Sequence, residues 1–159
     1  MKITILSVGK IKEKYLTDAI AEYAKRLSRY CRLEIIQVQD EKTPEKISDV
    51  QKEQILNKEG SRLEVLIKED AYVIALAIEG RQLSSEEFAA LIDRSGIQGI
   101  SHIVFIIGGS LGLSQKILAR ADYQLSFSKM TFPHQLMRVI LLEQIYRSYR
   151  IINHEPYHK

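Results

Sequence analysis

Three glycines within five positions mark the part of the sequence best suited to bind a ligand. Gly108, Gly109 and Gly112 follow the apolar run "HIVFII" (102–107) and precede Ser114, which can cap a helix. An apolar strand that leads into a glycine turn and a helix is the usual ligand position in an α/β fold. The spacing is G-G-x-x-G, and it matches neither the G-x-G-x-x-G of dinucleotide-binding proteins nor a P-loop. The glycines therefore serve either another ligand or a tight turn alone.

Alternating apolar runs and helical patterns predict the elements that would position this turn. Strands are expected at 3–8, 33–39, 72–78, 102–107 and 123–127. Helices are expected at about 15–30, from Thr43 and Pro44 to about 68 with a break near Gly60, after the Ser84–Glu87 capping box, from Ser114 to Ala121, and from Pro133 to about 151. With 159 residues, 45% of them hydrophobic, the chain predicts a single α/β domain over 1–159, with a mainly parallel sheet and helices on both faces.

The last predicted helix is apolar almost all the way round. Its apolar residues are Leu136, Met137, Val139, Ile140, Leu141, Leu142, Ile145, Tyr146 and Tyr149. Such a helix must be covered on more than one side. We therefore expect a homodimer formed through this C-terminal helix, and the alternative is a helix that is wholly internal to the core.

Charge is distributed unevenly along the chain. Residues 1–32 hold eight Lys or Arg against three Asp or Glu, residues 33–126 hold ten against fifteen, and residues 127–159 hold five against two. Basic ends around an acidic middle indicate either a polyanionic partner or ordinary solvated helix faces. No segment approaches the roughly 20 apolar residues of a membrane span, so we expect a soluble, cytoplasmic protein that does not bind membranes.

Metal chemistry is not indicated by the sequence. The four histidines and the single cysteine, Cys31, show no ligand-like cluster. Cys31 cannot form an internal disulfide, which is typical of a buried thiol in a reducing compartment.

Three motifs in order resemble one known family. "IIGGSLGLS" after the apolar strand, "LSFSKMTFPHQLMRVILLEQIYRS" and the terminal "NHEPYHK" are similar to the ribosomal RNA large-subunit methyltransferase H family, small members of the SPOUT methyltransferases. The similarity extends over the whole chain and includes the N-terminal "MKITILSVGKIK". It implies a C-terminal trefoil knot, a feature that general folding rules would not suggest because threaded chains are very rare.

The resemblance implies S-adenosylmethionine as methyl donor, with no metal. The implied contacts are Leu76, Gly108, Phe127, Ser128, Lys129, Met130, Thr131 and Phe132. Apolar side chains and loop backbone groups suit adenine, which is a flat apolar ring with a polar edge. Gly108 would let the main chain approach the ligand, whereas Gly109 and Gly112 would only shape the turn.

The implied reaction is methyl transfer to N3 of a pseudouridine in 23S ribosomal RNA. N3–H must lose its proton, so a base or an anion-stabilising group is needed. Tyr157 and His158 in the tail are the candidates for a catalytic or substrate-positioning role, although His158 could instead be a mobile terminal residue. Arg147, Arg150 and Lys159 are the expected phosphate partners. Glu155 interrupts the "NHPYH" pattern associated with some relatives. Recognition is expected to require the dimer and the assembled ribosome.

Two other classes of function remain open from the sequence. One is a flavodoxin-like module that binds a nucleotide or flavin at the glycines without methyl transfer. The other is a non-catalytic, ribosome-associated RNA-binding protein. The absence of G-x-G-x-x-G argues against the first.

Overall fold

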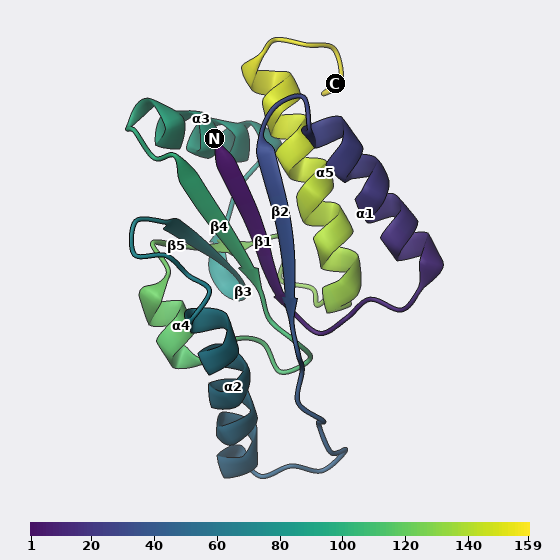
Figure 1. The fold of residues 1–159 in the computed structure, drawn as a ribbon, viewed down its shortest axis with the longest axis vertical. Coiled ribbons are helices and arrows are strands. Elements are labelled where there is room, and N and C mark those ends of the chain that lie inside the picture. Colours follow the sequence, from purple (N-terminus) through teal and green to yellow (C-terminus); the bar gives the residue numbers. More distant parts are fainter.

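Five parallel strands form one sheet at the centre of the computed structural model, which describes residues 1–159. In chain order the strands are β1 (Lys2–Val8), β2 (Arg32–Val38), β3 (Tyr72–Gln82), β4 (His102–Ile107) and β5 (Tyr123–Ser126). Their order across the sheet is β2-β1-β4-β3-β5, and every neighbouring pair is parallel (Figure 1). The predicted α/β class with a mainly parallel sheet is confirmed. The trefoil knot stays a prediction, because strand order alone does not determine whether the chain is threaded.

Helices cover both faces of the sheet (Figure 1). On one face lie α1 (Lys14–Leu27), α3 (Ser85–Ile97) and α5 (His134–Ile152), and on the other lie α2 (Asp49–Glu64) and α4 (Gln115–Arg120). The strands supply both cores by alternation. Ile3 and Ile5 of β1 belong to the core that contains Leu141 of α5, whereas Leu6 of β1 belongs to the core that contains Leu63 of α2.

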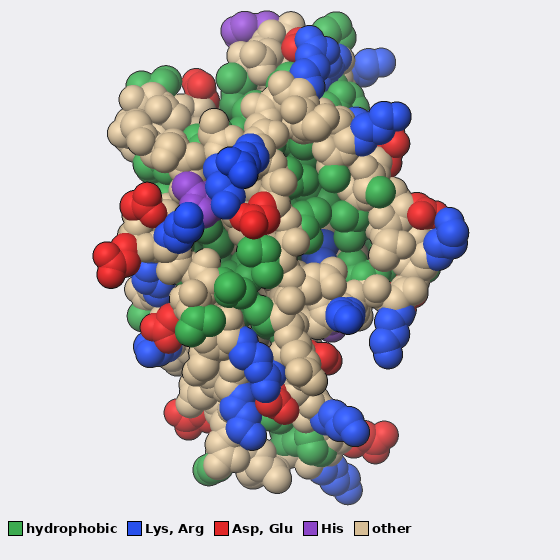
Figure 2. Space-filling view, in the orientation of Figure 1, with side chains coloured by type: hydrophobic (Ala, Val, Ile, Leu, Met, Phe, Trp, Pro, Cys, Tyr) green, Lys and Arg blue, Asp and Glu red, His purple; other side chains and the backbone are tan.

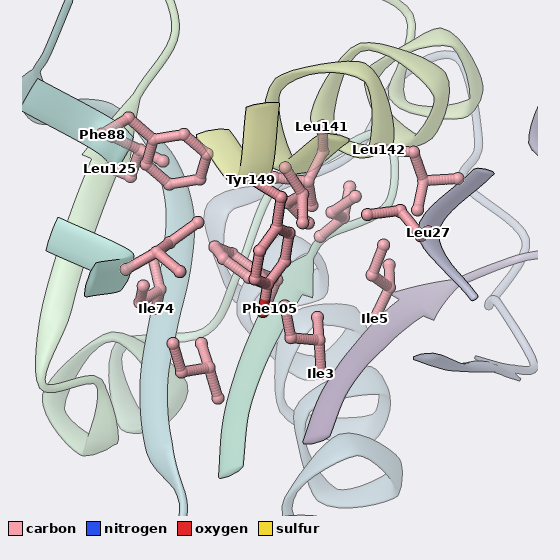
Figure 3. Close-up of a cluster of buried hydrophobic side chains, with 14 residues drawn as sticks. Ile3, Ile5, Leu27, Ile74, Phe88, Phe105, Leu125, Leu141, Leu142 and Tyr149 are labelled. Atoms are coloured by element: carbon pink, nitrogen blue, oxygen red, sulfur yellow. The ribbon is translucent and has the colours of Figure 1, made fainter. Parts of the chain in front are cut away.

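The larger core holds α5 against the sheet. Fourteen buried side chains form it, and Figure 3 shows Leu141, Leu142 and Tyr149 of α5 facing the strand residues Ile5 and Phe105. Full burial of each such Leu or Ile stabilises the fold by about 1.5–3 kcal/mol. Because α5 also packs against α1 and α3, three of its sides are covered within the chain. No helix has the length and apolar character required to cross a membrane.

The second predicted helix begins later than expected. Thr43 and Pro44 lie in irregular chain, and α2 starts at Asp49 after the N-cap Ser48. Ser48 and Gln51 form a capping box that satisfies backbone N–H groups at the helix start, which Thr43 does not do. The predicted break near Gly60 is also wrong, since the helix runs through this residue to Glu64.

Strand β3 runs past the predicted stop at Glu79 and Gly80. Its pairing with β5 is interrupted between Leu76 and Arg81, and both of these residues pair with Leu125. The residues between Leu76 and Arg81 do not pair with β5, and the pairing resumes at Arg81. Gly80 lies against the β5 backbone at the return point, where a Cβ atom would come 2.7 Å from the carbonyl oxygen of Gln124. Glycine therefore permits the strand to continue here.

Candidate functional site

The three segments that the resemblance assigns to the ligand belong to three neighbouring strands. Gly108 follows β4, residues 127–132 follow β5, and Leu76 lies within β3, where the ladder with β5 is interrupted. β3 stands between β4 and β5, and Leu76 is level with Leu125 of β5. On the other side, the register of β3 with β4 ends at the pair Ala75 and Ile106, so Leu76 comes directly after the last pair. Neighbouring strands are about 4.8 Å apart, so Leu76 lies one strand away from both Gly108, which follows β4, and Phe127, which follows β5. The fold thus brings these three predicted residues to one part of the carboxyl edge.

The glycine turn after β4 is closed by its own backbone. Gly109 and Gly112 form an antiparallel bridge, in which the Gly112 N–H donates to the Gly109 carbonyl at 3.1 Å. Gly112 has a φ of +87°, which favours glycine. A Cβ atom on Gly108 would lie 2.3 Å from the Gly112 carbonyl oxygen. The space that a side chain of Gly108 would occupy is therefore filled by the turn, so the turn itself requires a glycine at 108 as well as at 112.

The backbone of Gly108 remains without a partner. Gly108 is buried, yet neither its N–H nor its C=O makes a hydrogen bond within the chain. Buried backbone groups are almost always paired, and an unpaired one costs about 1–3 kcal/mol. A ligand that pairs with these two groups would remove this cost, and the edge of an adenine ring offers both a donor and an acceptor.

A hollow of about 170 Å³ opens beside the end of β5. It lies between the start of α3, the end of β5 and the middle of α5, and its lining is half apolar and half polar: Leu83, Ser84, Ser85, Phe88, Leu125, Ser126, Phe127 and Gln144. This chemistry fits a flat ring with a polar edge. The volume is below the roughly 300–1,000 Å³ of ordinary ligand pockets, so the hollow accommodates only part of a nucleoside-sized ligand. Of the predicted contacts, only Phe127 lines it.

The loop between β5 and α5 carries the other predicted contacts. Ser126 donates to the Ser128 carbonyl at 3.0 Å, and the Ser128 hydroxyl accepts from the Met130 N–H at 3.0 Å. These bonds fix the turn, while Lys129 and Thr131 are exposed. Met130 is 74% and Phe132 38% exposed. The loop therefore presents apolar side chains and backbone outward, as expected of a surface that a ligand or second protein covers.

Tyr157 of the tail lies folded against α5. Its hydroxyl donates to Glu143 Oε1 at 3.0 Å, its ring meets the ring of Tyr146 edge-on at 4.9 Å, and the Arg147 guanidinium lies 4.7 Å from its ring centre. Desolvation and the Glu143 carboxylate raise the pKa of Tyr157 to about 12. Tyr157 thus stays protonated at neutral pH and is suited to donate a hydrogen bond rather than to accept a proton.

His158 uses both ring nitrogens. Nε2 lies 2.8 Å from Glu86 Oε1, and Nδ1 lies 3.2 Å from Arg147 Nη1. Because Arg147 can only donate, the network assigns a neutral imidazole with the proton on Nε2. The structure therefore gives this terminal residue fixed partners. His158 thus binds to the first turn of α3, the helix that supplies Ser85 and Phe88 to the lining of the hollow.

Several site residues were not predicted from the sequence. Glu143 bonds to Tyr157 and to Arg147, and Glu155 bonds to Tyr30 and Arg150 and so anchors the tail. The i,i+4 spacing of Glu143 and Arg147 is a signal that could have identified that pair. Glu155, which interrupts the motif, gave no sign of its anchoring role.

Arg138 is a further buried charge near the carboxyl edge. It is 1% exposed, and its Nη2 donates to the carbonyls of Val8 and Gly9, both at 2.8 Å. Its Nε and Nη1 have no partner, and burial lowers its pKa. Arg138 thereby ties the first turns of α5 to the end of β1. No group of three or more His, Cys, Asp or Glu side chains gathers as metal ligands would.

The chain belongs to the SPOUT methyltransferases. A family model described as "Predicted SPOUT methyltransferase" matches residues 1–158. Among solved structures, a probable methylase family protein from Haemophilus influenzae Rd KW20 has a similar fold, with a TM-score of 0.52 at 13% identity over 99% of this chain and 70% of that chain.

Relatives of higher identity show which family of SPOUT methyltransferases the chain belongs to. The chain is 68% identical to the ribosomal RNA large subunit methyltransferase H of Bifidobacterium adolescentis and 61% identical to that of Clostridium beijerinckii, each over the full length of both chains. A putative enzyme of the same name from Methanococcus maripaludis is 65% identical over the same extent. The chain belongs to the ribosomal RNA large subunit methyltransferase H family, and the flavodoxin-like interpretation is set aside.

Proposed function

We propose that the protein transfers a methyl group from S-adenosylmethionine to N3 of a pseudouridine in 23S ribosomal RNA of the large subunit. The names of its full-length relatives support the class of substrate. The observation that carries the donor site is the buried, unpaired backbone of Gly108 beside Leu76 and the loop at 127–132. Residues 127–132 are proposed to complete the contacts to the donor.

The reaction requires little beyond placement and one proton transfer. When bound, S-adenosylmethionine supplies an electrophilic methyl group on a sulfonium. As the new carbon–nitrogen bond forms, the carbon–sulfur bond breaks with its electron pair left on sulfur, and the N3 proton must leave. Holding N3 in line with the methyl group accounts for as much as roughly 7–11 kcal/mol of the barrier. The protein's part is to position the base and to stabilise the N3 anion.

Side chains of the C-terminal tail can position the base and stabilise the N3 anion. Tyr157 stays protonated and can donate to a uracil-type oxygen that gains negative charge, while His158 can accept a proton once Arg147 releases Nδ1. Both side chains are tied to neighbours of the hollow through Glu143 and Glu86. These contacts support a role for the tail next to the donor site.

Ribosomal RNA would meet the side of the molecule where the two basic ends of the chain come together. α1 packs against α5, so basic residues of the two helices share one region, as where Arg26 of α1 and Arg150 of α5 both lie against the ring of Tyr146. Figure 2 shows Lys and Arg side chains along α1 and near the C-terminus. Arginines there alternate with aromatic rings, as where Arg26 lies 5.4 Å from the ring centre of Tyr23. Such surfaces bind phosphates and stack on bases.

A homodimer through α5 is part of the proposal, with action in the cytoplasm. α5 is covered on three sides, and Leu136 on its first turns is 36% exposed, close in sequence to the exposed Phe132 and Met130. These apolar residues adjoin a donor site whose hollow is too small for a whole nucleoside-sized ligand. A second copy placed over this patch would enlarge and close the site. A monomer by sedimentation at micromolar concentration would contradict the dimer.

Calorimetric titration with S-adenosylmethionine and S-adenosylhomocysteine tests the donor site. Saturable binding of both is expected, and no binding at millimolar ligand would refute the site. A non-catalytic RNA-binding protein is distinguished by incubating the protein with labelled donor and large ribosomal subunits from cells that lack this gene. Transfer of label to 23S RNA is expected only of the enzyme.

A further inference from the structure

Helix α2 contains a buried carboxylate that no ion pair explains. Glu59 is 5% exposed and forms no salt bridge, and Arg62, three residues further along the same helix, pairs with Glu41 at 2.6 Å instead. The one hydrogen bond of the Glu59 side chain is accepted by Oε2 from the Glu41 N–H, at 3.0 Å. Desolvation raises the pKa of Glu59. A carboxylate buried at such cost requires a structural or functional reason.

Glu59 and its neighbour Gly60 touch both ends of the glycine turn. A Cβ atom on Gly109 would lie 3.5 Å from both carboxylate oxygens of Glu59 and 3.2 Å from Val8 Cγ1, so Gly109 is held between α2 and the end of β1. A Cβ atom on Gly60 would lie 2.6 Å from Ser114 Oγ, the hydroxyl that caps α4. Two successive residues of α2 thus contact the first and last parts of the segment 109–114.

The segment 39–43, which follows β2, also packs against the glycine turn beside α2. Arg62 donates to the Gln39 carbonyl at 2.8 Å and pairs with Glu41, while Glu41 in turn donates its N–H to Glu59. Thr43 Oγ1 lies 3.4 Å from the hydroxyl of Ser110, at the tip of the turn. The segment 39–43 and α2 therefore surround the glycine turn on the side away from Leu76 and Phe127.

We propose that Glu59, together with Gly60, positions the glycine turn so that the Gly108 backbone meets the methyl donor. Glu59 is a positioning residue, because its proposed action passes through Glu41, to which it bonds, and through Gly109, beside which it lies. The inference rests on the proposed donor site at Gly108. Gly109 directly follows Gly108, so a shift of Gly109 also moves the unpaired carbonyl and N–H groups of Gly108. Displacements of about 1 Å at such groups can cost about 100-fold in function.

Two substitutions of Glu59 test this role, because they differ in which chemical groups remain beside Gly109. Glu59→Ala removes the acceptor for the Glu41 N–H and leaves a void, and it is expected to weaken S-adenosylmethionine binding at least about tenfold. Glu59→Gln keeps the shape and an acceptor oxygen, and it should bind the donor within about threefold of the wild type. Glu53→Ala is the matched control, since Glu53 is an exposed acidic residue of the same helix.

Hydrogen exchange of the ligand-free protein provides a readout independent of the donor. In Glu59→Ala the Glu41 and Gly112 amides should exchange at least about tenfold faster, whereas Glu59→Gln and Glu53→Ala should exchange like the wild type. If Glu59→Ala does not fold, Glu59→Asp decides, because it keeps the charge but withdraws the carboxylate by one methylene. Unchanged exchange and unchanged affinity in the folded variant would overturn the inference. Failure of the wild type to bind the donor would instead refute the proposed function. The exchange data would still test whether Glu59 holds the glycine turn in place.

Discussion

Replacing Gly108 by alanine should damage the donor site through a defined collision. The new Cβ atom would lie 2.3 Å from the carbonyl oxygen and 2.5 Å from the carbonyl carbon of Gly112. Ordinary contacts begin near 3.4 Å, so the turn would have to open by about 1 Å. Overpacking of this kind costs typically about 1–3 kcal/mol, and each kcal/mol lowers the melting temperature of a domain of this size by about 2–4 °C. The opened turn also displaces the Gly108 N–H and C=O, so S-adenosylmethionine affinity should fall at least about tenfold.

The assay pairs thermal unfolding with calorimetric titration of the donor. Gly99→Ala is the matched control, since Gly99 has a φ of +86° and no atom within 4 Å of its Cβ position. It should lose about 1–2 kcal/mol of stability from its left-handed backbone and keep the wild-type affinity. Wild-type affinity in Gly108→Ala would refute the reasoning, because the turn would then not contribute to the donor site.

Three further perturbations separate the roles of other residues. Tyr157→Phe removes the hydroxyl that binds Glu143; methylation should fall at least about tenfold with donor affinity unchanged, whereas a matching loss of affinity would place Tyr157 in donor binding instead. Arg138→Met removes two hydrogen bonds to β1, and urea unfolding should show a loss of about 2–4 kcal/mol; an unchanged midpoint would contradict that structural role. Burial raises the folded-state pKa of Glu59, so the wild type should lose stability relative to Glu59→Gln as pH rises through that pKa, and the difference should level off below the pKa of the unfolded state. A pH-independent difference in unfolding free energy would contradict the burial of charge.

Much of the framework could be predicted because the three central strands, β1, β4 and β3, contain long, largely apolar runs. Strands buried on both faces require such runs, and the predicted strand 102–107 coincides with β4. The start of α2 was predicted wrongly because Thr43 and Pro44 carry the same kind of signal as the true cap. Ser48 and Gln51 prevail because they satisfy N–H groups at both positions of a capping box.

The candidate site could be proposed from the sequence only where its residues belong to a local motif. The glycine turn and the loop at 127–132 are contiguous, and the resemblance identified them. The reason for Gly108 was not predictable, because it depends on the Gly112 carbonyl folding back. Glu59 bonds to a distant segment, and a buried carboxylate has no signature in a single sequence. The pairing of Glu143 with Arg147 could have been found from the i,i+4 spacing, but the bond of Glu143 to Tyr157 of the tail could not. Their roles follow from packing, which brings α2 to the glycine turn and the tail to α5.

Mass spectrometry of 23S ribosomal RNA tests the central claim most directly. Large ribosomal subunits from cells that lack this gene would be incubated with the purified protein and S-adenosylmethionine, and the RNA would be digested to nucleosides. One added methyl group on a pseudouridine, dependent on both protein and donor, is the predicted result. A pseudouridine fraction that stays unmethylated, in subunits from which the native modification is absent, would contradict the account.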